Sequence, residues 1–437
     1  DKENWLIWGR APYGTPLVMF NPHPFDCMLK ATVHATIAAA ENETGDAVFL
    51  QKIRAERTNV HDKYDTLVYT RVPAMGYTTV MLHEGEPAPE EASPLRVTQT
   101  TLENGRLRAR FDEATGSLAS LALDGRESLS APARLLLMDI AHVDTWAHNV
   151  FAFDREIGAI ERPAFTILEN GPVRASLRVV RTNGRTTVSE IYRLYRDGDQ
   201  LEVDVRLDFH EHYAMLKLEV PVACASPAEI AEIPLGVQAR KMTGNEEPCQ
   251  RWCALSGSEN GLAILNTGKF SYSAKNGALR LTLANGSQSA DHNGRDERDD
   301  TVEFLDQGVQ RFTYALCPFA GGWADAGLNR RAEILNQPGF TVAETYHKGP
   351  LPRAYTGARP QGDEVVLECL KLSEDGAGYI VRLREPVGRA AHGTLHLPLL
   401  SADIPYRLSP FDMKTWFVSK DGGIVREVLI TELPLET

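Results

Sequence analysis

Short stretches in which hydrophobic and polar residues alternate dominate the chain. Two of them flank a turn at Glu113–Gly116, and three follow one another between Val173 and Phe209. Successive side chains of a β-strand point to opposite faces, so this period of two predicts strands with one buried face. Hairpin turns are predicted where residues that accept positive φ interrupt the alternation, namely at Asn183-Gly184, Asp197-Gly198 and Asn276-Gly277.

Helical periodicity is scarce. The best case is Ala324–Gln337, where Leu328 and Leu335 fall on one face and Pro338 ends the pattern. The segment KATVHATIAAAENE is interpreted as a strand through about Ile37. Because strands do not alternate with long helices, the sequence predicts an all-β, multidomain β-sandwich protein and disfavours a parallel βαβ architecture.

Two segments are interpreted as linkers. His83–Pro94 is rich in proline, alanine and glutamate, and His347–Glu364 is rich in proline and glycine, so neither carries enough apolar residues to form a core. They predict three domains: an N-terminal β-sandwich unit at 1–84, a larger β unit at 93–340 and a C-terminal β-sandwich unit at 362–437. No repeat of fixed period is found, which disfavours propellers and solenoids.

The composition is that of a globular protein with an acidic balance. The 437 residues are 43% hydrophobic and 24% charged, with 46 Lys and Arg against 59 Asp and Glu, a formal charge of −13. This charge argues against nucleic acid and anionic membranes as partners, because phosphates attract basic surfaces. No apolar run approaches the roughly 20 residues of a membrane helix, and no secretory leader is recognised.

Residues that could bind metal are few. His210 and His212 lie two apart on a predicted strand and could form a metal site with Asp208, but a structural role is favoured because no further ligand cluster accompanies them. Cys249 and Cys253 lack a second pair of ligands, so the cysteines are interpreted as structural thiols. Their irregular spacing favours a reduced, cytoplasmic setting over a disulfide framework.

The motifs of common active sites are missing. The sequence has no nucleophile elbow, P-loop or dinucleotide fingerprint. Glycoside hydrolysis needs two carboxyl groups a few Å apart, and in an all-β chain no such pair can be assigned from spacing. From its residues alone, the chain is a large, acidic, multidomain β-sandwich protein that is compatible with a sugar-related function.

An ordered series of segments resembles a known family. Val18–Asp26, VMFNPHPFD, is similar to the opening of the C-terminal half of glycoside hydrolase family 38 α-mannosidases, and further similar segments follow in the family's order as far as Val418. Phe319 and Asp208-Phe209 depart from the family pattern, which has His and Asp-Trp there. The other matching segments include VPAMGYTTVML, LENGRLRARFDEATGSLASLAL, DTWAHN, AEIPLGVQAR, FLDQGVQRFTYALCPFAGGW, LECLKLSEDGAGYIVRLREPVGR and LSPFDMKTWFV.

The resemblance implies a fold and a division of labour. The large β unit is expected to be a galactose-mutarotase-like supersandwich, flanked by smaller β-sandwich units. In the family this half follows a catalytic domain and a helical bundle. The chain is therefore expected to start near the point where the helical bundle ends and the β half begins. The nucleophile, the acid and the zinc ligands belong to the missing part, so no catalytic or metal-binding residue is assigned here. Asn21 and Pro22 are given a structural role, since proline ends strand pairing and asparagine can bond nearby backbone.

The resemblance also implies that loops of this half reach the sugar site. The candidates are Asp144, Trp146 and His148, with Asp306 and Gln307 as a second patch. An indole offers an apolar face to a sugar ring, and a carboxylate accepts hydroxyl hydrogen bonds. The competing structural interpretation makes the tryptophan a core residue, the first aspartate a turn cap and the second patch a β-turn.

Three functions remain open at this stage. The first is the C-terminal, non-catalytic half of a retaining, zinc-dependent α-mannosidase, with an α-mannoside and the missing catalytic domain as its partners. The alternative is a stand-alone carbohydrate-binding β-sandwich module. The third is an enzyme whose site lies wholly within this chain. A catalytic domain encoded upstream would favour the first, and carboxylates clustered in one cleft would favour the third.

Overall fold

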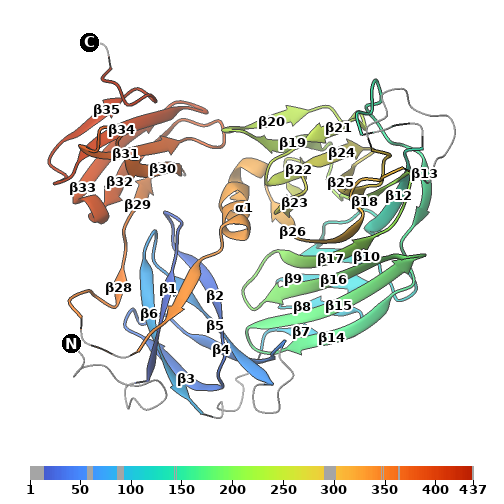
Figure 1. Cartoon of the computed structure of the whole chain (residues 1–437), viewed down its shortest axis with the longest axis horizontal. Helices are drawn as coiled ribbons and strands as arrows, with labels where there is room; N and C mark the ends of the chain where they lie inside the picture. The colour runs from blue at the N-terminus through green and yellow to red at the C-terminus, as the bar shows by residue number, and fades with distance from the viewer. Residues whose placement is uncertain are drawn as a thin grey trace. The chain divides into compact units, whose positions relative to one another are not determined.

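Strands form most of the structure, a computed structural model that describes residues 14–56, 63–85, 93–141, 143, 145–289, 302–345, 347, 349–362 and 365–435 (Figure 1). Within these residues there is one α-helix, α1 (Leu328–Asn336), and it is far too short to cross a membrane. The all-β prediction is therefore confirmed. The chain divides into two compact units: a first unit of Asp1–Pro89, Leu235–Val237 and Gln337–Thr437, and a second of Glu90–Pro234 and Gln238–Asn336.

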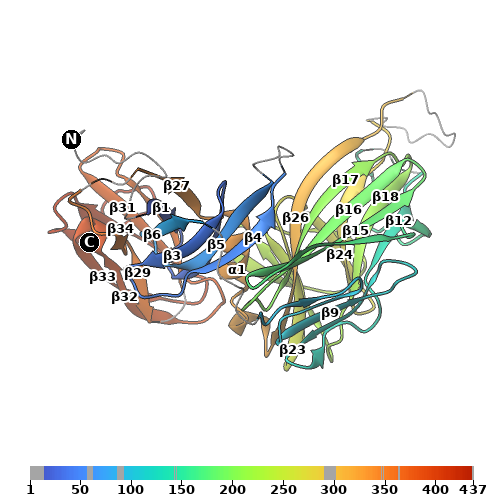
Figure 2. The ribbon, with the colours of Figure 1, turned by 90° about the horizontal axis from the view of Figure 1, so that it is seen from below.

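The second unit contains a nine-stranded antiparallel sheet, in which β26 lies beside β17 (Figure 2). Buried and half-exposed side chains alternate along β17, which explains the period of two in the sequence. In spatial order the strands are β14 (Ala164–Asn170), β15 (Arg174–Asn183), β16 (Thr186–Tyr195), β17 (Leu201–Phe209), β26 (Gly308–Ala320), β23 (Asn260–Asn266), β22 (Trp252–Ser256), β19 (Ala228–Ile233) and β20 (Gly236–Arg240).

Two smaller sheets share a core with the nine-stranded sheet. One hydrophobic cluster takes Leu121 and Leu281 from the smaller sheets and Leu177 and Leu316 from the large one. This is the large β-sandwich that the resemblance predicted. The six-stranded sheet runs β13 (Glu156–Ala159), β12 (Arg134–Asp139), β18 (Ala214–Pro221), β25 (Ala278–Asn285), β24 (Ser271–Lys275) and β21 (Glu246–Pro248); the five-stranded sheet runs β11 (Arg126–Glu127), β10 (Leu118–Leu123), β9 (Leu107–Phe111), β8 (Thr101–Glu103) and β7 (Arg96–Val97).

Two of the predicted hairpin turns are two-residue turns. At Asn276-Gly277 both residues have positive φ, 53° and 76°, which is the predicted type I′ pattern. At Asn183-Gly184 the turn is displaced by one residue. Asn183 pairs with Thr186, and only Gly184 has positive φ, because a glycine in the first turn position suits a type II′ turn.

At the predicted turn Asp197-Gly198 the two strands are joined by a longer connection than predicted. β16 ends at Tyr195 and β17 begins at Leu201, and neither Asp197 nor Gly198 has positive φ. Asn104, from another hairpin, donates its amide to the carbonyl oxygens of Tyr195 and Gly198, at 2.8 and 2.7 Å. This contact between distant segments stabilises an open connection in place of a tight turn.

The predicted helix exists but begins later. A 3₁₀ turn covers Trp323–Asp325, and α1 starts only at Leu328. Gly327 has a φ of 61°, a left-handed conformation that a continuous right-handed helix cannot contain. The helix ends two residues before Pro338, as the sequence predicts.

The first unit contains two pairs of sheets. One pair consists of β27 (Phe340–Ala343), β1 (Thr15–Phe20), β6 (Tyr77–Glu84) and β28 (Ala354–Tyr355), with β3 (Ile37–Asn42) also on β6, and of β2 (Cys27–Val33), β5 (Tyr64–Val72) and β4 (Phe49–Arg54). The other pair consists of β29 (Arg359–Gly362), β32 (Ala391–Leu397) and β33 (Ala402–Leu408), and of β30 (Val366–Leu372), β31 (Gly378–Arg384), β34 (Met413–Ser419) and β35 (Val425–Val428).

These strands correct two sequence interpretations. The segment 347–364, interpreted as a linker, contains β28 and the start of the second pair of sheets. The ambiguous segment KATVHATIAAAENE forms the end of β2 and all of β3, so strand structure continues beyond Ile37. Most of the other proposed linker, 86–92, lies outside the described residues, and the three-domain boundaries stay a prediction.

Asn21 and Asp26 fix the turn after β1; the sequence predicted a structural role for Asn21 but did not single out Asp26. The Asn21 amide donates to the carbonyl oxygens of Phe25 (2.8 Å) and Pro73 (2.9 Å), and its oxygen accepts from the backbone nitrogen of His23 (2.9 Å). Asp26 accepts from the Ala74 nitrogen at 2.9 Å and forms ion pairs with two arginines, Arg71 and Arg359. The polar residues of this segment therefore serve the backbone.

Candidate functional site

The segment between β12 and β13 carries the first candidate patch. Asp144 lies outside the described residues. Trp146 is 58% exposed, and His148 is also exposed. Their rings are stacked, with 6.3 Å between centroids and 10° between planes. The two side chains thus present an aromatic surface to solvent, and the alternative of a core tryptophan is wrong.

A small second core holds this segment on the outer side of the six-stranded sheet. Leu136 and Met215 of that sheet pack with Ile140 and Phe153 of the segment. Positive φ values at Ala147 (46°) and Asn149 (59°) let the chain turn back within a few residues. The exposed rings therefore stand on a packed base.

Backbone hydrogen bonds fasten both ends of the segment. Thr145 donates to the carbonyl oxygen of Gln288 at 3.1 Å. Glu246 of β21 donates its backbone nitrogen to the oxygen of Phe151 at 2.7 Å. The position of the Trp146 ring is therefore tied to two neighbouring chain segments of the second unit.

The second candidate patch is a turn whose side chains already bond backbone. Asp306 has a φ of 55°, and its Oδ2 accepts from the Asn285 nitrogen at 2.8 Å. Gln307 Nε2 donates to the oxygens of Glu211 (3.1 Å) and Leu305 (2.9 Å). These bonds are those of the β-turn interpretation, although both side chains are exposed. A role in substrate binding stays a prediction for both patches.

In the structure, both patches are hydrogen-bonded to the same short segment, residues 285–288. Asp306 bonds Asn285, Thr145 bonds Gln288, and Gln288 forms a β-bridge with Phe304. Segments more than 130 residues apart in sequence are thereby joined at one end of the second unit. Sequence spacing gave no sign of this juxtaposition.

A second stacked pair at this end was missed. The rings of His212 and Phe304 are stacked with 3.8 Å between centroids. His210 instead contacts Asp208, with 2.9 Å between Nε2 and Oδ1, so the two histidines serve different partners. Within the described residues, no three His, Cys, Asp or Glu side chains gather as metal ligands would. The arrangement can stack on a sugar ring and bond its hydroxyls, but it offers no ligand set for zinc.

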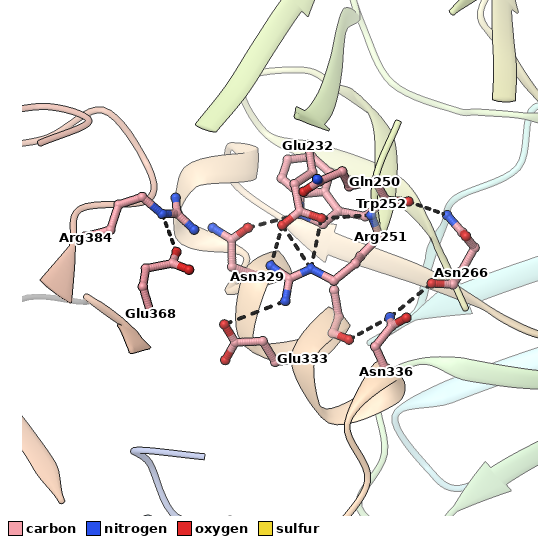
Figure 3. A network of polar contacts seen from close by, with 11 residues as sticks. Glu232, Gln250, Arg251, Trp252, Asn266, Asn329, Glu333, Asn336, Glu368 and Arg384 are labelled. Carbon is pink, nitrogen blue, oxygen red and sulfur yellow. Dashed lines mark hydrogen bonds and ion pairs between the residues drawn. The ribbon is translucent and has the colours of Figure 1, made fainter. Parts of the chain in front are cut away.

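Buried carboxylates of the second unit serve the fold. Glu232 accepts from the backbone nitrogen of Arg251 at 2.8 Å and from its Nε at 3.1 Å (Figure 3). The Arg251 guanidinium also lies 3.8 Å from Glu333 of α1. Trp252 Nε1 donates to Asn329 of the same helix at 3.1 Å. This network attaches α1 to β22.

One more buried carboxylate has a perturbed ionisation. Burial raises the pKa of Glu229, whose Oε1 accepts from the Tyr272 hydroxyl at 2.8 Å. Its side chain is 2% exposed. Because no substrate could reach it, a raised pKa here marks a core interaction and gives no support for an acid catalyst.

The first unit carries an apolar groove of about 560 Å³. Four aromatic rings line it: Phe20 and Phe340, stacked 4.6 Å apart, and Tyr77 and Tyr355, 6.1 Å apart. Gly76 allows the backbone of Tyr355 to pack closely against it, because a Cβ there would lie 1.8 Å from the Tyr355 carbonyl oxygen. Few polar atoms face the groove, which suits apolar polypeptide better than a sugar.

Comparison with known proteins identifies the relatives. Residues 102–293 match the family model of the glycosyl hydrolases family 38 C-terminal domain. The chain is 27% identical over 368 residues to alpha-mannosidase 2C1 of Mus musculus, and 23% identical over 308 residues to alpha-mannosidase G of Dictyostelium discoideum. The matches cover 76% and 66% of this chain but 33% and 26% of the relatives, so the chain spans about a third of their length or less.

Solved structures show the same fold. A glycosyl hydrolase family 38 protein from Enterococcus faecalis superimposes with a TM-score of 0.74 and 16% identity, covering 93% of this chain and 58% of that one. An alpha-mannosidase from Enterococcus faecalis V583 gives 0.71 and 15%, covering 95% and 57%. The family-model match and the α-mannosidase relatives confirm the resemblance seen in the sequence, and the solved structures share its fold.

Proposed function

We infer that this chain is the C-terminal, non-catalytic part of a glycosyl hydrolase family 38 α-mannosidase whose parent protein cleaves α-mannosides with retention. The observation that carries the proposal is the match of residues 102–293 to the family's C-terminal domain, combined with coverage of only about a third of the α-mannosidase relatives. The chain supports the catalytic domain of the parent, and its Trp146 patch lines an outer sugar subsite.

Zinc, in this proposal, is held by the catalytic domain. The described residues offer no cluster of three metal-binding side chains. The family resemblance assigns the nucleophile, the acid and the zinc ligands to the missing part, so no step of the hydrolysis is assigned to residues of this chain. These residues instead hold the exposed Trp146 and His148 rings in place on a packed base, and they provide a surface on which the catalytic domain packs.

The purified chain is expected to show no hydrolysis of an aryl α-mannoside, with or without added zinc. The reason is that the nucleophile and the acid are assigned to the missing part. Release of the aryl group is measured by absorbance, and the whole parent protein serves as the positive control. Zinc-dependent turnover by the chain alone would contradict the proposal and favour an enzyme contained within it.

The groove of the first unit is proposed as the face that packs on the missing domain. Its apolar aromatic lining and the length of polypeptide that the relatives have beyond this chain support this choice. The same assay tests it: the chain is added to the separately produced remainder of the parent, and activity is measured. Phe340→Ser, at a 59% exposed ring, should weaken this reconstitution, while Phe270→Ser, a 62% exposed residue of the second unit outside both candidate patches, should not.

Replacing Trp146 by alanine is expected to leave the stability of the chain within about 0.5 kcal/mol of the original, because the side chain is largely exposed. In the parent it should weaken mannoside binding about fivefold, the loss of roughly 1 kcal/mol of aromatic contact, while zinc stays bound. Urea unfolding and substrate titration provide the two measurements.

The matched control is Trp252→Ala. This indole is fully buried and donates to Asn329, so its removal should cost about 3–5 kcal/mol. If Trp146→Ala lowers the urea midpoint by a comparable amount, the subsite assignment fails and the residue is structural. Tight binding of mannosides by the chain alone would instead favour a stand-alone carbohydrate-binding module.

A further inference from the structure

Asn-Gly pairs are unusually frequent in this chain. There are seven, and six of them lie in the described residues: Asn104-Gly105, Asn170-Gly171, Asn183-Gly184, Asn260-Gly261, Asn276-Gly277 and Asn285-Gly286. We propose that Asn276 is a site of spontaneous deamidation, and that it reacts fastest of these six because the fold restrains the other five. The proposal is independent of the mannosidase assignment.

The chemistry needs only the two residues and water. The backbone nitrogen of the glycine attacks Cγ of the asparagine, a nitrogen–carbon bond forms, the Cγ–Nδ2 bond breaks and ammonia leaves with the amide proton. Water then opens the cyclic imide at either carbonyl and gives aspartate or isoaspartate. Glycine has no Cβ to hinder the attack. In a folded protein the rate therefore depends on whether the side chain and backbone can move.

Two of the pairs are locked through the amide group itself. Asn104 is 5% exposed, and its Nδ2 donates to two carbonyl oxygens. Asn260 is 6% exposed, its Nδ2 donates to the Ala223 oxygen at 2.7 Å, and its Oδ1 accepts from Arg126 at 3.0 Å. Attack on Cγ would break all of these bonds.

Three further pairs are restrained in other ways. Asn183 donates its amide to Glu211 Oε1 at 3.2 Å. Gly286, which would supply the attacking nitrogen at Asn285, donates that nitrogen's hydrogen to the Ala214 oxygen at 2.9 Å. Asn170 is exposed, but its backbone is paired with Ala175 in the sheet, which holds it extended.

Asn276 differs from the other five in the freedom of its side-chain amide and of the backbone nitrogen that would attack it. It is exposed, at the first position of the two-residue turn between β24 and β25. In such a hairpin the N–H of the second turn residue, here Gly277, lies outside the strand ladder. Within the described part of the chain, the structure gives the Asn276 amide no hydrogen-bond partner. The attacking nitrogen and the amide that it attacks are thus free of hydrogen bonds of their own, although the carbonyl oxygen of Gly277 accepts from the Val222 nitrogen at 2.9 Å.

The product would change a turn that borders the main core. Isoaspartate adds one carbon to the main chain of the turn, only two residues from the paired and buried Ala274 and Leu279. The reaction also replaces a neutral amide by a negative charge in a chain that is already acidic. Accumulation of this product with age should therefore make the chain heterogeneous in charge.

Peptide mapping by mass spectrometry tests the proposal. The folded chain is incubated at mildly alkaline pH, and conversion is followed in the six peptides in parallel. Asn276 should react at least about tenfold faster than Asn104 and Asn260, as expected when the latter require local opening. In urea the six rates should agree to within about twofold, because the restraints are lost.

Asn276→Gln is the control variant, since its longer side chain disfavours ring closure and leaves the amide in place. It should remove the fast reaction and lower the stability by no more than about 1 kcal/mol, about fivefold in the unfolding equilibrium, because glutamine accepts the positive φ of this turn position less well than asparagine. The proposal fails if any other of the six pairs reacts faster in the folded chain, or if the spread of rates is the same with and without urea.

Discussion

Replacing Arg181 by methionine is expected to lower the free energy of unfolding of the second unit by about 3–5 kcal/mol. Arg181 and Glu190 form an ion pair on neighbouring strands, and both are almost completely buried. The carboxylate also accepts from the Tyr314 hydroxyl at 2.8 Å. Burial raises the pKa of Tyr314, so the phenol keeps its proton and remains a donor.

The size of the effect comes from the charge that is left behind. Methionine fills much of the volume of the arginine stem, but Glu190 would then hold a negative charge with a single neutral donor inside the core. Urea unfolding followed by tryptophan fluorescence measures the change. The double variant Arg181→Met with Glu190→Met should recover most of the stability. If both variants are equally destabilised, lost packing and not the unpaired carboxylate is the cause.

Replacing Asn21 by alanine is expected to destabilise the first unit by about 3 kcal/mol. The side chain is 3% exposed, and its loss removes the amide donor from three carbonyl oxygens and the acceptor from one backbone nitrogen. Buried polar groups that lose a partner pay the full desolvation cost, which exceeds the net value of a hydrogen bond.

Asn42→Ala provides the comparison for this prediction. Asn42 also lies in the first unit, but it is only half-buried. Its Nδ2 makes a long contact of 3.4 Å to Thr70, and its Oδ1 accepts from the exposed Thr44 hydroxyl at 3.1 Å. Its replacement should cost less than about 1 kcal/mol. Equal urea midpoints for Asn21→Ala and the unchanged chain would show that the turn after β1 does not depend on this side chain.

The strands were predictable because their pattern is local. Alternation along β17 reflects one buried face, and the type I′ turn at Asn276-Gly277 follows from two residues that accept positive φ. Prediction from the sequence failed where contacts between residues far apart in the chain determine the local conformation. Asn104 holds open the connection at Asp197, and β28 is too short to recognise until it is paired with β6.

The candidate site shows the same limit. The exposure of Trp146 followed from treating its segment as a loop with a functional face. The stacking of His212 on Phe304 and the four-ring groove were missed, because their members come from segments that only the fold brings together. Aromatic residues at such positions have the same spacing as ordinary strand residues, so a single sequence does not distinguish them.

The strand β27 has a consequence for the order of events during synthesis. It pairs with β1, matching Leu17 with Ala343, so the sheet at the start of the chain includes a strand made more than 300 residues later. The second unit is nearly continuous in sequence and can fold as soon as it leaves the ribosome. The edge of β1 stays unpaired until β27 has been made, a period in which exposed strand edges invite aggregation. Ribosome-stalled chains ending before and after β27 should therefore differ sharply in how well proteases cleave β1.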